Sequence, residues 1–289
     1  MHNTGFLIPS LSTKQAVKLN YITMKNLFYT VIIASVLIIT GCNKNIQNDV
    51  QKPEQKPKVE VKKDKLDFLT EDNIKLVADY YYYSDNKDKK QPLIILIHQF
   101  RSSREQWDKS FIDTLLSKNY KVLAYDIRNH GESGKASVDQ MELLTSREQA
   151  PKDVDAVLNW AYMQKGIDSG KVGIVGTSIG GSLGIYAKMF KGVSSVVAVS
   201  AGKETFQAFT GYDDRMMSSS RMFARTKNIM FICGSSDGSY LEEEKNIYDS
   251  YLTEPREIIK FENDKHGKDL IVQYPEILKL ITNWFSKTL

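Results

Sequence analysis

A serine framed by two glycines, between an apolar run and a helix-like segment, constrains the fold of this chain most. Gly176, Ser178 and Gly180 form a G-x-S-x-G pattern, preceded by the strand-like residues 171–175 and followed by the helix-like residues 182–188. Small residues are needed where a backbone bends sharply and packs close to its neighbours. The pattern predicts a nucleophile elbow, a turn that holds the serine hydroxyl above a sheet at a helix N-terminus. The alternative is an ordinary glycine-rich turn.

A serine nucleophile needs a general base and an acid that orients the base. In one known order of these residues, the acid and then the histidine follow the serine along the chain. Of the four histidines, only His266 lies after Ser178, and it follows the strand-like residues 257–261. Asp237 follows another buried-strand pattern, residues 228–233. Both side chains therefore come just after predicted strands, where open α/β sheets place their sites.

Two neighbouring aspartates are alternative candidates for the acid. Asp213 and Asp214 also lie between Ser178 and His266. No predicted strand precedes them, so Asp237 is the favoured assignment. Asp264, two residues before His266, is interpreted as a turn residue.

Two further motifs accompany the serine, the acid and the histidine. Residues 92–98 form an apolar run that ends in His98, and residues 126–134 read Asp-Ile-Arg-Asn-His-Gly-Glu-Ser-Gly. With the G-x-S-x-G pattern, these motifs resemble the α/β-hydrolase family over residues 66–289, and within it the dienelactone hydrolases and small esterases. The resemblance implies a mostly parallel central sheet with helices on both faces and a short cap insertion.

The same resemblance implies an oxyanion hole, in which backbone N–H groups bind the negatively charged oxygen of the reaction intermediate. The expected donors are the amides of Ile179 and Phe100, with Gln99 as the less favoured second donor. The family usually has glycine where this chain has Gln99. One such donor contributes roughly 3–4 kcal/mol of transition-state stabilisation.

The remaining polar residues near these motifs are interpreted as structural. We expect His98 to order the oxyanion loop, and Asp126 and His130 to fix a loop beside the site. Cys233 ends a strand-like run and is interpreted as a small core residue. The chain has no cluster of His, Cys and carboxylate residues with metal-ligand spacing, so we predict neither a metal nor a cofactor.

Strand-like and helix-like segments alternate along residues 66–289, which favours a parallel sheet wrapped by helices. Residues 200–228 lie between two predicted strands and are rich in aromatic residues and methionine. We expect them to form either a small cap that lines an acyl pocket or a helix that packs on the core. Strands are predicted over 73–83, 93–97, 121–125, 172–175, 195–199, 229–233 and 257–261, and helices over 103–117, 147–163, 179–190, 241–251 and 269–287.

The N-terminal part has the pattern of a bacterial lipoprotein signal. Lys25 precedes 14 almost wholly apolar residues, 27–40, which suit a secretory signal and are short for a membrane span. Residues 39–42, Ile-Thr-Gly-Cys, resemble a lipobox, which implies cleavage before Cys42 and its lipidation. An uncleaved anchor helix and an unmodified signal peptide are the alternatives. We expect Met24 to be the true start, with residues 1–23 an upstream extension.

Charge divides the chain into the same parts. Residues 1–42 contain three lysines and no acid, and residues 43–65 contain seven lysines and four acids, so the net charge of +4 leaves −2 for residues 66–289. This distribution argues against a nucleic-acid-binding face. We therefore predict three parts: an extension and signal peptide over 1–41, a lipidated cysteine and solvated spacer over 42–65, and a hydrolase domain over 66–289.

Together these patterns predict a serine hydrolase that acts on esters with small to medium acyl groups. A lipid anchor on Cys42 would hold it on the outer side of a membrane, and two or more acyl chains would be needed for a stable anchor. The same residues are compatible with a peptidase or a thioesterase. A non-catalytic surface binding lipoprotein is the alternative from another class.

Overall fold

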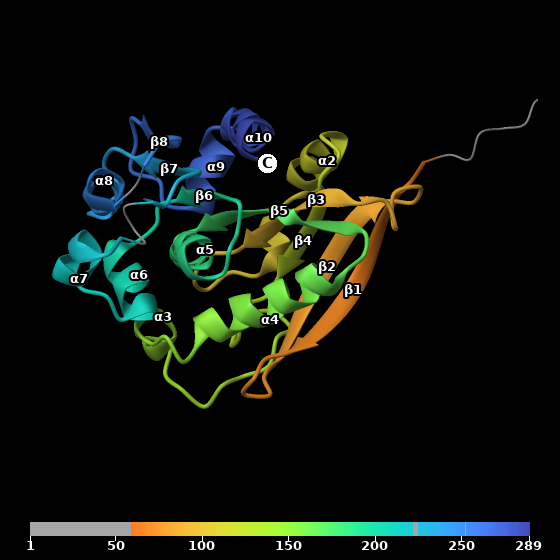
Figure 1. Ribbon diagram of the computed structural model, residues 1–289, viewed down its shortest axis with the longest axis horizontal. Helices are drawn as coiled ribbons and strands as arrows, with labels where there is room; N and C mark the ends of the chain where they lie inside the picture. Colours follow the sequence, from red (N-terminus) through yellow and green to blue (C-terminus); the bar gives the residue numbers. More distant parts are fainter. Residues whose placement is uncertain (1–58, 222–224, 252) are drawn as a thin grey trace, which may run out of the picture. The chain divides into compact units, whose positions relative to one another are not determined.

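An eight-stranded sheet forms the centre of the part of the chain that the computed structural model describes, residues 59–221, 225–251 and 253–289 (Figure 1). The strand order is β1-β2-β4-β3-β5-β6-β7-β8, with β2 antiparallel to β1 and β4 and the other neighbours parallel. The predicted signal peptide, Cys42 and most of the predicted spacer lie outside these residues. The strands are β1 Val61–Leu69, β2 Lys75–Tyr83, β3 Gln91–Ile97, β4 Lys121–Tyr125, β5 Ile167–Thr177, β6 Ser195–Val199, β7 Ile229–Gly234 and β8 Arg256–Phe261.

Helices cover both faces of this sheet (Figure 1). On one face α2 and α10 contribute to a buried apolar cluster, and on the other face α4 and α5 contribute to a second one. The helices are α2 Lys109–Ser117, α3 Glu142–Thr145, α4 Ala150–Met163, α5 Ile179–Phe190, α6 Lys203–Thr210, α7 Asp214–Ser219, α8 Tyr240–Tyr251, α9 Lys268–Gln273 and α10 Ile277–Thr288, with a 3₁₀ turn η2 over Arg104–Gln106.

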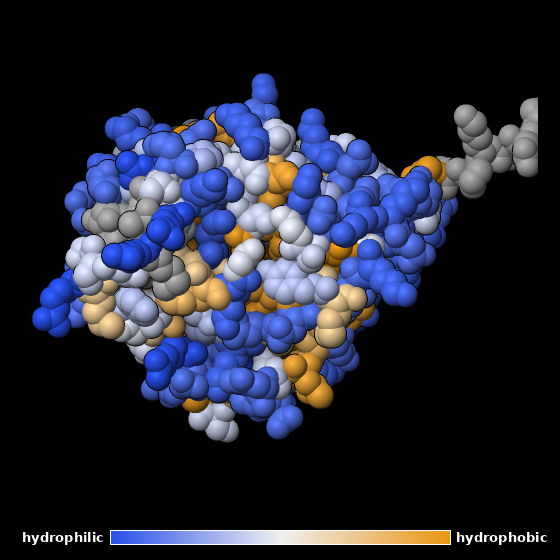
Figure 2. Space-filling view, in the orientation of Figure 1, coloured by the Kyte–Doolittle hydropathy of each residue, from blue (hydrophilic) through white to orange (hydrophobic). Residues whose placement is uncertain are grey.

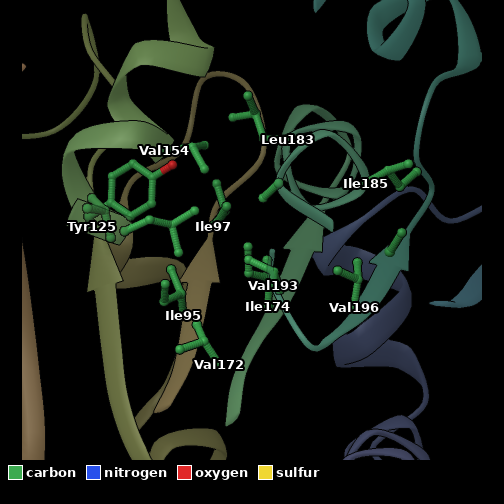
Figure 3. Close-up of a cluster of buried hydrophobic side chains, with 14 of the residues drawn as sticks. Ile95, Ile97, Tyr125, Val154, Val172, Ile174, Leu183, Ile185, Val193 and Val196 are labelled. Carbon is green, nitrogen blue, oxygen red and sulfur yellow. The ribbon is translucent and has the colours of Figure 1, made fainter. Parts of the chain in front are cut away.

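The central strand β3 shows why its sequence is continuously apolar. Ile94 and Leu96 belong to the cluster under α2 and α10, whereas Ile95 and Ile97 belong to the cluster under α4 and α5. Side chains of a strand alternate between faces, so a strand covered on both sides needs apolar residues at every position. Figure 3 shows Ile95 and Ile97 packed in the second cluster with Leu183 of α5.

The first strand begins before the predicted domain boundary. β1 starts at Val61, so residues 61–65 of the predicted solvated spacer belong to the sheet. Most of the side chains of β1 are exposed or half-buried, because it is an edge strand held by backbone pairing to β2. In the sequence, the lysines of this exposed strand therefore look like those of a solvated spacer, which is what was predicted for residues 61–65.

The C-terminal helix predicted over residues 269–287 is two helices. α9 ends at Gln273 and α10 begins at Ile277, with Pro275 between them. Proline lacks a backbone N–H and disfavours helical geometry in the residue before it, so the chain turns there. The short helix α3 was not predicted.

The surface of the described residues is mixed in character. Hydrophilic residues cover much of the face seen in Figure 2, and apolar residues appear in scattered areas. Among the helices of residues 59–221, 225–251 and 253–289, none has both the length and the apolar character needed to cross a membrane.

Candidate active site

Ser178 occupies a strained turn between β5 and α5. Its backbone has φ 52° and ψ −117°, a region that residues other than glycine rarely adopt. The turn is held by hydrogen bonds: the Ser178 amide donates to the Val199 carbonyl at 2.8 Å, and the amides of Gly181 and Ser182 donate to the Ser178 carbonyl at 2.9 and 3.1 Å. The geometry is that expected of a nucleophile elbow.

Two glycines make this turn possible through close backbone contacts. A Cβ atom on Gly176 would lie 2.0 Å from the carbonyl oxygen of Gly180. A Cβ atom on Gly180 would lie 2.3 Å from the carbonyl oxygen of Ile97, at the end of β3. Any side chain at either position would push the elbow away from the sheet.

Asp237 and His266 lie together at the ends of neighbouring strands. Asp237 follows β7 and His266 follows β8, and the His266 Nδ1 atom lies 3.0 Å from both carboxylate oxygens of Asp237. The Asp237 side chain is buried, while that of His266 is 30% exposed. With Nδ1–H donating to the carboxylate, Nε2 is the ring nitrogen that can accept a proton.

The other two acid candidates are engaged elsewhere. The Asp213 carboxylate caps α7 by accepting a hydrogen bond from the Met216 amide at 2.7 Å. The Asp214 carboxylate accepts from Lys203 Nζ and from the side chain of Gln207. Of the three predicted candidates, Asp237 is the one that bonds His266.

Ser178 and His266 line one pocket of about 260 Å³. Both residues lie in the described part of the chain, and no hydrogen bond joins the Ser178 hydroxyl to the His266 ring there. In active sites without bound substrate, hydrogen bonds between catalytic groups are often long. The pocket is lined by Gln99, Phe100, Leu144, Ser178, Ile179, Gly202, Thr205, Tyr240 and His266.

Both predicted oxyanion donors, Phe100 and Ile179, line the pocket. Within the described residues, no hydrogen bond is found from the amide of Phe100 or from that of Ile179, the first residue of α5. The Gln99 amide, by contrast, donates to Gln106 Oε1 at 3.2 Å, and the Arg101 amide donates to His130 Nε2 at 3.0 Å. Phe100 is therefore better placed than Gln99 to supply the second donor.

Two histidines order the loop that carries these amides. His98 Nδ1–H donates to the Gln99 carbonyl at 2.8 Å, and its Nε2 accepts from the Ile127 amide at 3.0 Å. Burial lowers the pKa of His98 to about 4, so its ring is neutral near pH 7. His130 Nδ1–H likewise donates to the Arg128 carbonyl at 2.9 Å. These contacts are the ordering roles that the sequence predicts.

Behind Asp237 lie two buried side chains: Cys233, predicted as a small core residue, and Glu244, which was not predicted. The Cys233 thiol donates to Asp237 Oδ2 at 3.8 Å, and burial raises the pKa of this thiol. Glu244 is fully buried, accepts a hydrogen bond from the Ala201 amide at 2.7 Å, and has its pKa raised well above the usual range by burial. The run of three glutamates in α8 resembled a solvated helix face, so no sequence signal distinguished Glu244.

The segment between β6 and β7 contributes little to the pocket. Phe206 and Phe209 are buried in the core cluster, which supports the second alternative, a helix packed on the core. Thr205, next to this core, does line the pocket, as does Tyr240, whose ring centroid lies 4.4 Å from that of His266. Neither residue was predicted. In the described residues no group of three or more His, Cys, Asp or Glu side chains is arranged to bind a metal ion.

Comparison with known proteins points to the same fold. A family model described as the alpha/beta hydrolase fold matches residues 92–231. An uncharacterised 31.7 kDa protein from the traX-finO intergenic region of Escherichia coli is 33% identical over 92 residues, which is 32% of this chain and 30% of that relative. The match thus spans less than a third of the relative's length.

Two solved structures illustrate the structural likeness. The esterase Pf2001 of Pyrococcus furiosus is 21% identical, with a TM-score of 0.61 over 78% of this chain and 93% of that one. The dienelactone hydrolase of Anabaena variabilis is 14% identical, with a TM-score of 0.57 over 79% of this chain and 99% of that one. At these identities the likeness shows the fold, and the chemistry must be argued from the site.

Proposed function

Because the chain has the α/β-hydrolase fold, we propose that it is a serine hydrolase that cleaves carboxylic esters of small to medium acyl groups. The fold and its esterase and dienelactone hydrolase neighbours support a hydrolase. The observation that carries the finer proposal is the pocket shared by Ser178, on its strained elbow, and His266, paired with Asp237.

In the proposed reaction His266 accepts the proton of the Ser178 hydroxyl as the oxygen attacks the ester carbonyl. Asp237 holds the ring through Nδ1 and stabilises the imidazolium that forms. The amides of Ile179 and Phe100 bind the oxyanion of the tetrahedral intermediate. His266 then gives the proton to the leaving alcohol, and water releases the acid from Ser178 by the same steps in reverse.

The size of the pocket supports small and medium acyl groups. Its volume is about 260 Å³, and Phe100 and Leu144 provide apolar side chains beside the nucleophile. The helices between β6 and β7 are short, α6 and α7 having 8 and 6 residues, so they form no large lid. A long triglyceride chain would extend beyond such a site.

The test of this function is removal of the Ser178 hydroxyl. We expect Ser178→Ala to abolish turnover of p-nitrophenyl butyrate and labelling by a fluorophosphonate probe, while the thermal unfolding midpoint stays within a few degrees of the wild type. Ser218→Ala, on the surface of α7, is the matched control and should retain both. Wild-type turnover by Ser178→Ala would refute the assignment, and failure of the wild-type chain to react with the probe or any ester would refute the function.

We further propose that the protein is a lipoprotein anchored outside the cytoplasm through Cys42. The lipobox-like residues 39–42 carry this proposal. Cells that express the full chain and are fed labelled palmitate should incorporate label, and the protein should sediment with membranes. Cys42→Ala should lose both properties, whereas Cys233→Ala should keep them, and equal labelling of Cys42→Ala would contradict the proposal.

A further inference from the structure

The Gln99 side chain joins the oxyanion loop, residues 98–102, to the histidine loop, residues 262–268. Gln99 Oε1 accepts a hydrogen bond from the Lys268 amide at 2.8 Å, across 169 positions of the sequence. Lys268 is two residues after His266, so this bond fixes the backbone that carries the proposed base. A residue without a side-chain acceptor at position 99 could not make the contact.

A second glutamine extends the connection to the elbow. Gln106 Oε1 accepts a hydrogen bond from the Gln99 amide at 3.2 Å, and Gln106 Nε2 donates to Thr177 Oγ1 at 2.9 Å. Thr177 is fully buried and directly precedes Ser178. Gln99 and Gln106, which we call the glutamine clamp, therefore link the oxyanion loop, the elbow and the histidine loop.

The backbone after His266 is shaped to fit this clamp. Gly267 has φ 55°, and a Cβ atom there would lie 2.3 Å from Gln99 Oε1. The Gly267 amide donates to Ser200 Oγ at 3.0 Å. The two amides that follow the His266 ring are thus both held by side chains, one from the loop after β6 and one from the oxyanion loop.

We infer that Gln99, supported by Gln106, is a positioning residue that fixes the backbone carrying His266, and so the place of this ring in the pocket it shares with Ser178. The inference rests on the proposed function. A side-chain amide suits this task because its oxygen accepts from Lys268 without adding a charge beside the Asp237–His266 pair. Small displacements of a base from its working position can cost about 10²-fold in rate.

Removing the amide tests the clamp. In the full chain, Gln99→Ala should lower kcat for p-nitrophenyl butyrate by about ten- to a hundred-fold, with KM within about twofold. Gln164→Ala is the matched control, since it also removes a glutamine whose side chain bonds a backbone group, here the Trp160 carbonyl at the end of α4. It should leave kcat unchanged, and its unfolding midpoint should fall by about as much as that of Gln99→Ala.

A carboxylate at the same position provides the conservative rescue. Gln99→Glu keeps an acceptor for the Lys268 amide, so it should recover most of the kcat that Gln99→Ala loses. Its negative charge would join Asp237 and Tyr240, the titratable groups already beside His266. That charge favours the imidazolium, so the acidic limb of the pH profile of kcat/KM should move to higher pH. Absence of this shift would show that the side chain at position 99 does not lie beside the His266 ring.

Amide hydrogen exchange makes the clamp testable apart from turnover. Exchange over residues 266–268 should be faster in Gln99→Ala than in the wild type or Gln164→Ala, and slow again in Gln99→Glu. The clamp would be overturned if Gln99→Ala left amide exchange over residues 266–268 unchanged. It would also be overturned if the Gln99→Ala variant of an active enzyme kept the kcat of the wild type. The wild type could instead turn over no ester and react with no fluorophosphonate probe, while amide exchange still becomes faster in Gln99→Ala. That result would refute the hydrolase function and with it the positioning role, and Gln99 would then only connect two loops.

Discussion

Several polar side chains lie wholly inside the protein, and their hydrogen bonds explain why they are tolerated there. The Lys121 ammonium donates to the carbonyls of Lys87, Lys89 and Gly166 at 2.6 to 3.1 Å. The ring of His98 uses both nitrogens. Burial without such partners would cost several kcal/mol per group, so these contacts are conditions for the fold.

The buried ring of His98 predicts a loss of stability in acid. Its pKa is lowered from 6.5 to about 4 by burial, so between these values the unfolded chain binds a proton that the folded protein does not. The free energy of unfolding should therefore fall as the pH drops from about 6.5 to about 4. The part due to His98 is about 3 kcal/mol.

Urea unfolding at pH 7, 5.5 and 4 would measure this effect. In His98→Asn, the free energy of unfolding should depend less on pH between 6.5 and 4, because up to one proton fewer is taken up on unfolding. This difference in slope is expected whatever the stability of the variant at pH 7. Parallel pH dependences in the wild type and the variant would show that His98 does not cause the loss.

The elements around the elbow predict a sharp difference between two glycines of one strand. Gly176 and Gly170 both lie in β5, but only at Gly176 would a Cβ atom meet backbone, 2.0 Å from the Gly180 carbonyl. At Gly170 the nearest atom would be 3.6 Å away.

Gly176→Ala should lower the free energy of unfolding by about 3 kcal/mol or prevent folding, because β5 and α5 must separate. Gly170→Ala should change it by less than about 1 kcal/mol. Urea unfolding of both variants checks this, and equal effects would contradict the packing argument.

The elements that the sequence predicts well are those buried on both sides. Strands such as β4 and β6 have the predicted bounds because every position is buried and all but Lys121 are apolar or small. No strand was predicted over β1, where most side chains are exposed or half-buried, and one helix was predicted where Pro275 separates α9 from α10. Helix α3, with 4 residues, is too short to show a periodicity.

Only the site residues that lie in motifs or follow a known chain order could be predicted from the sequence. Chain order selected His266, and the strand-like run before it favoured Asp237. The two side chains are hydrogen-bonded, and their catalytic role stays a prediction. Gln106 and Tyr240 reach the site from segments without a motif. Their contribution depends on how the loops pack in three dimensions, which spacing along the chain does not encode.

At the scale of the whole molecule, the sheet order brings distant segments to one edge. β5, β6, β7 and β8 are parallel neighbours, so the elbow, Asp237 and His266 follow strand ends on the same side. Brief segments from the oxyanion loop, α3, α6 and α8 complete the pocket. The dimensions of the pocket are therefore a property of the assembled fold.

These dimensions predict how ester turnover depends on acyl length. Each methylene that the pocket accommodates contributes up to about 0.8 kcal/mol, so kcat/KM can rise about fourfold per carbon while room remains. A pocket of about 260 Å³ must hold the ester group and the acyl chain together. Across a series of p-nitrophenyl esters from acetate to decanoate, kcat/KM should rise to a maximum at the butyrate or hexanoate and then fall.

Leu144 is the apolar side chain whose removal should shift that maximum. It lines the pocket from α3, and Leu144→Ala should raise kcat/KM for the octanoate relative to the butyrate because longer chains gain room. Met141→Ala provides the control, since Met141 precedes the same helix but is 61% exposed and lies outside the pocket lining. Equal profiles for Leu144→Ala and the wild type would mean that the acyl chain does not lie against Leu144.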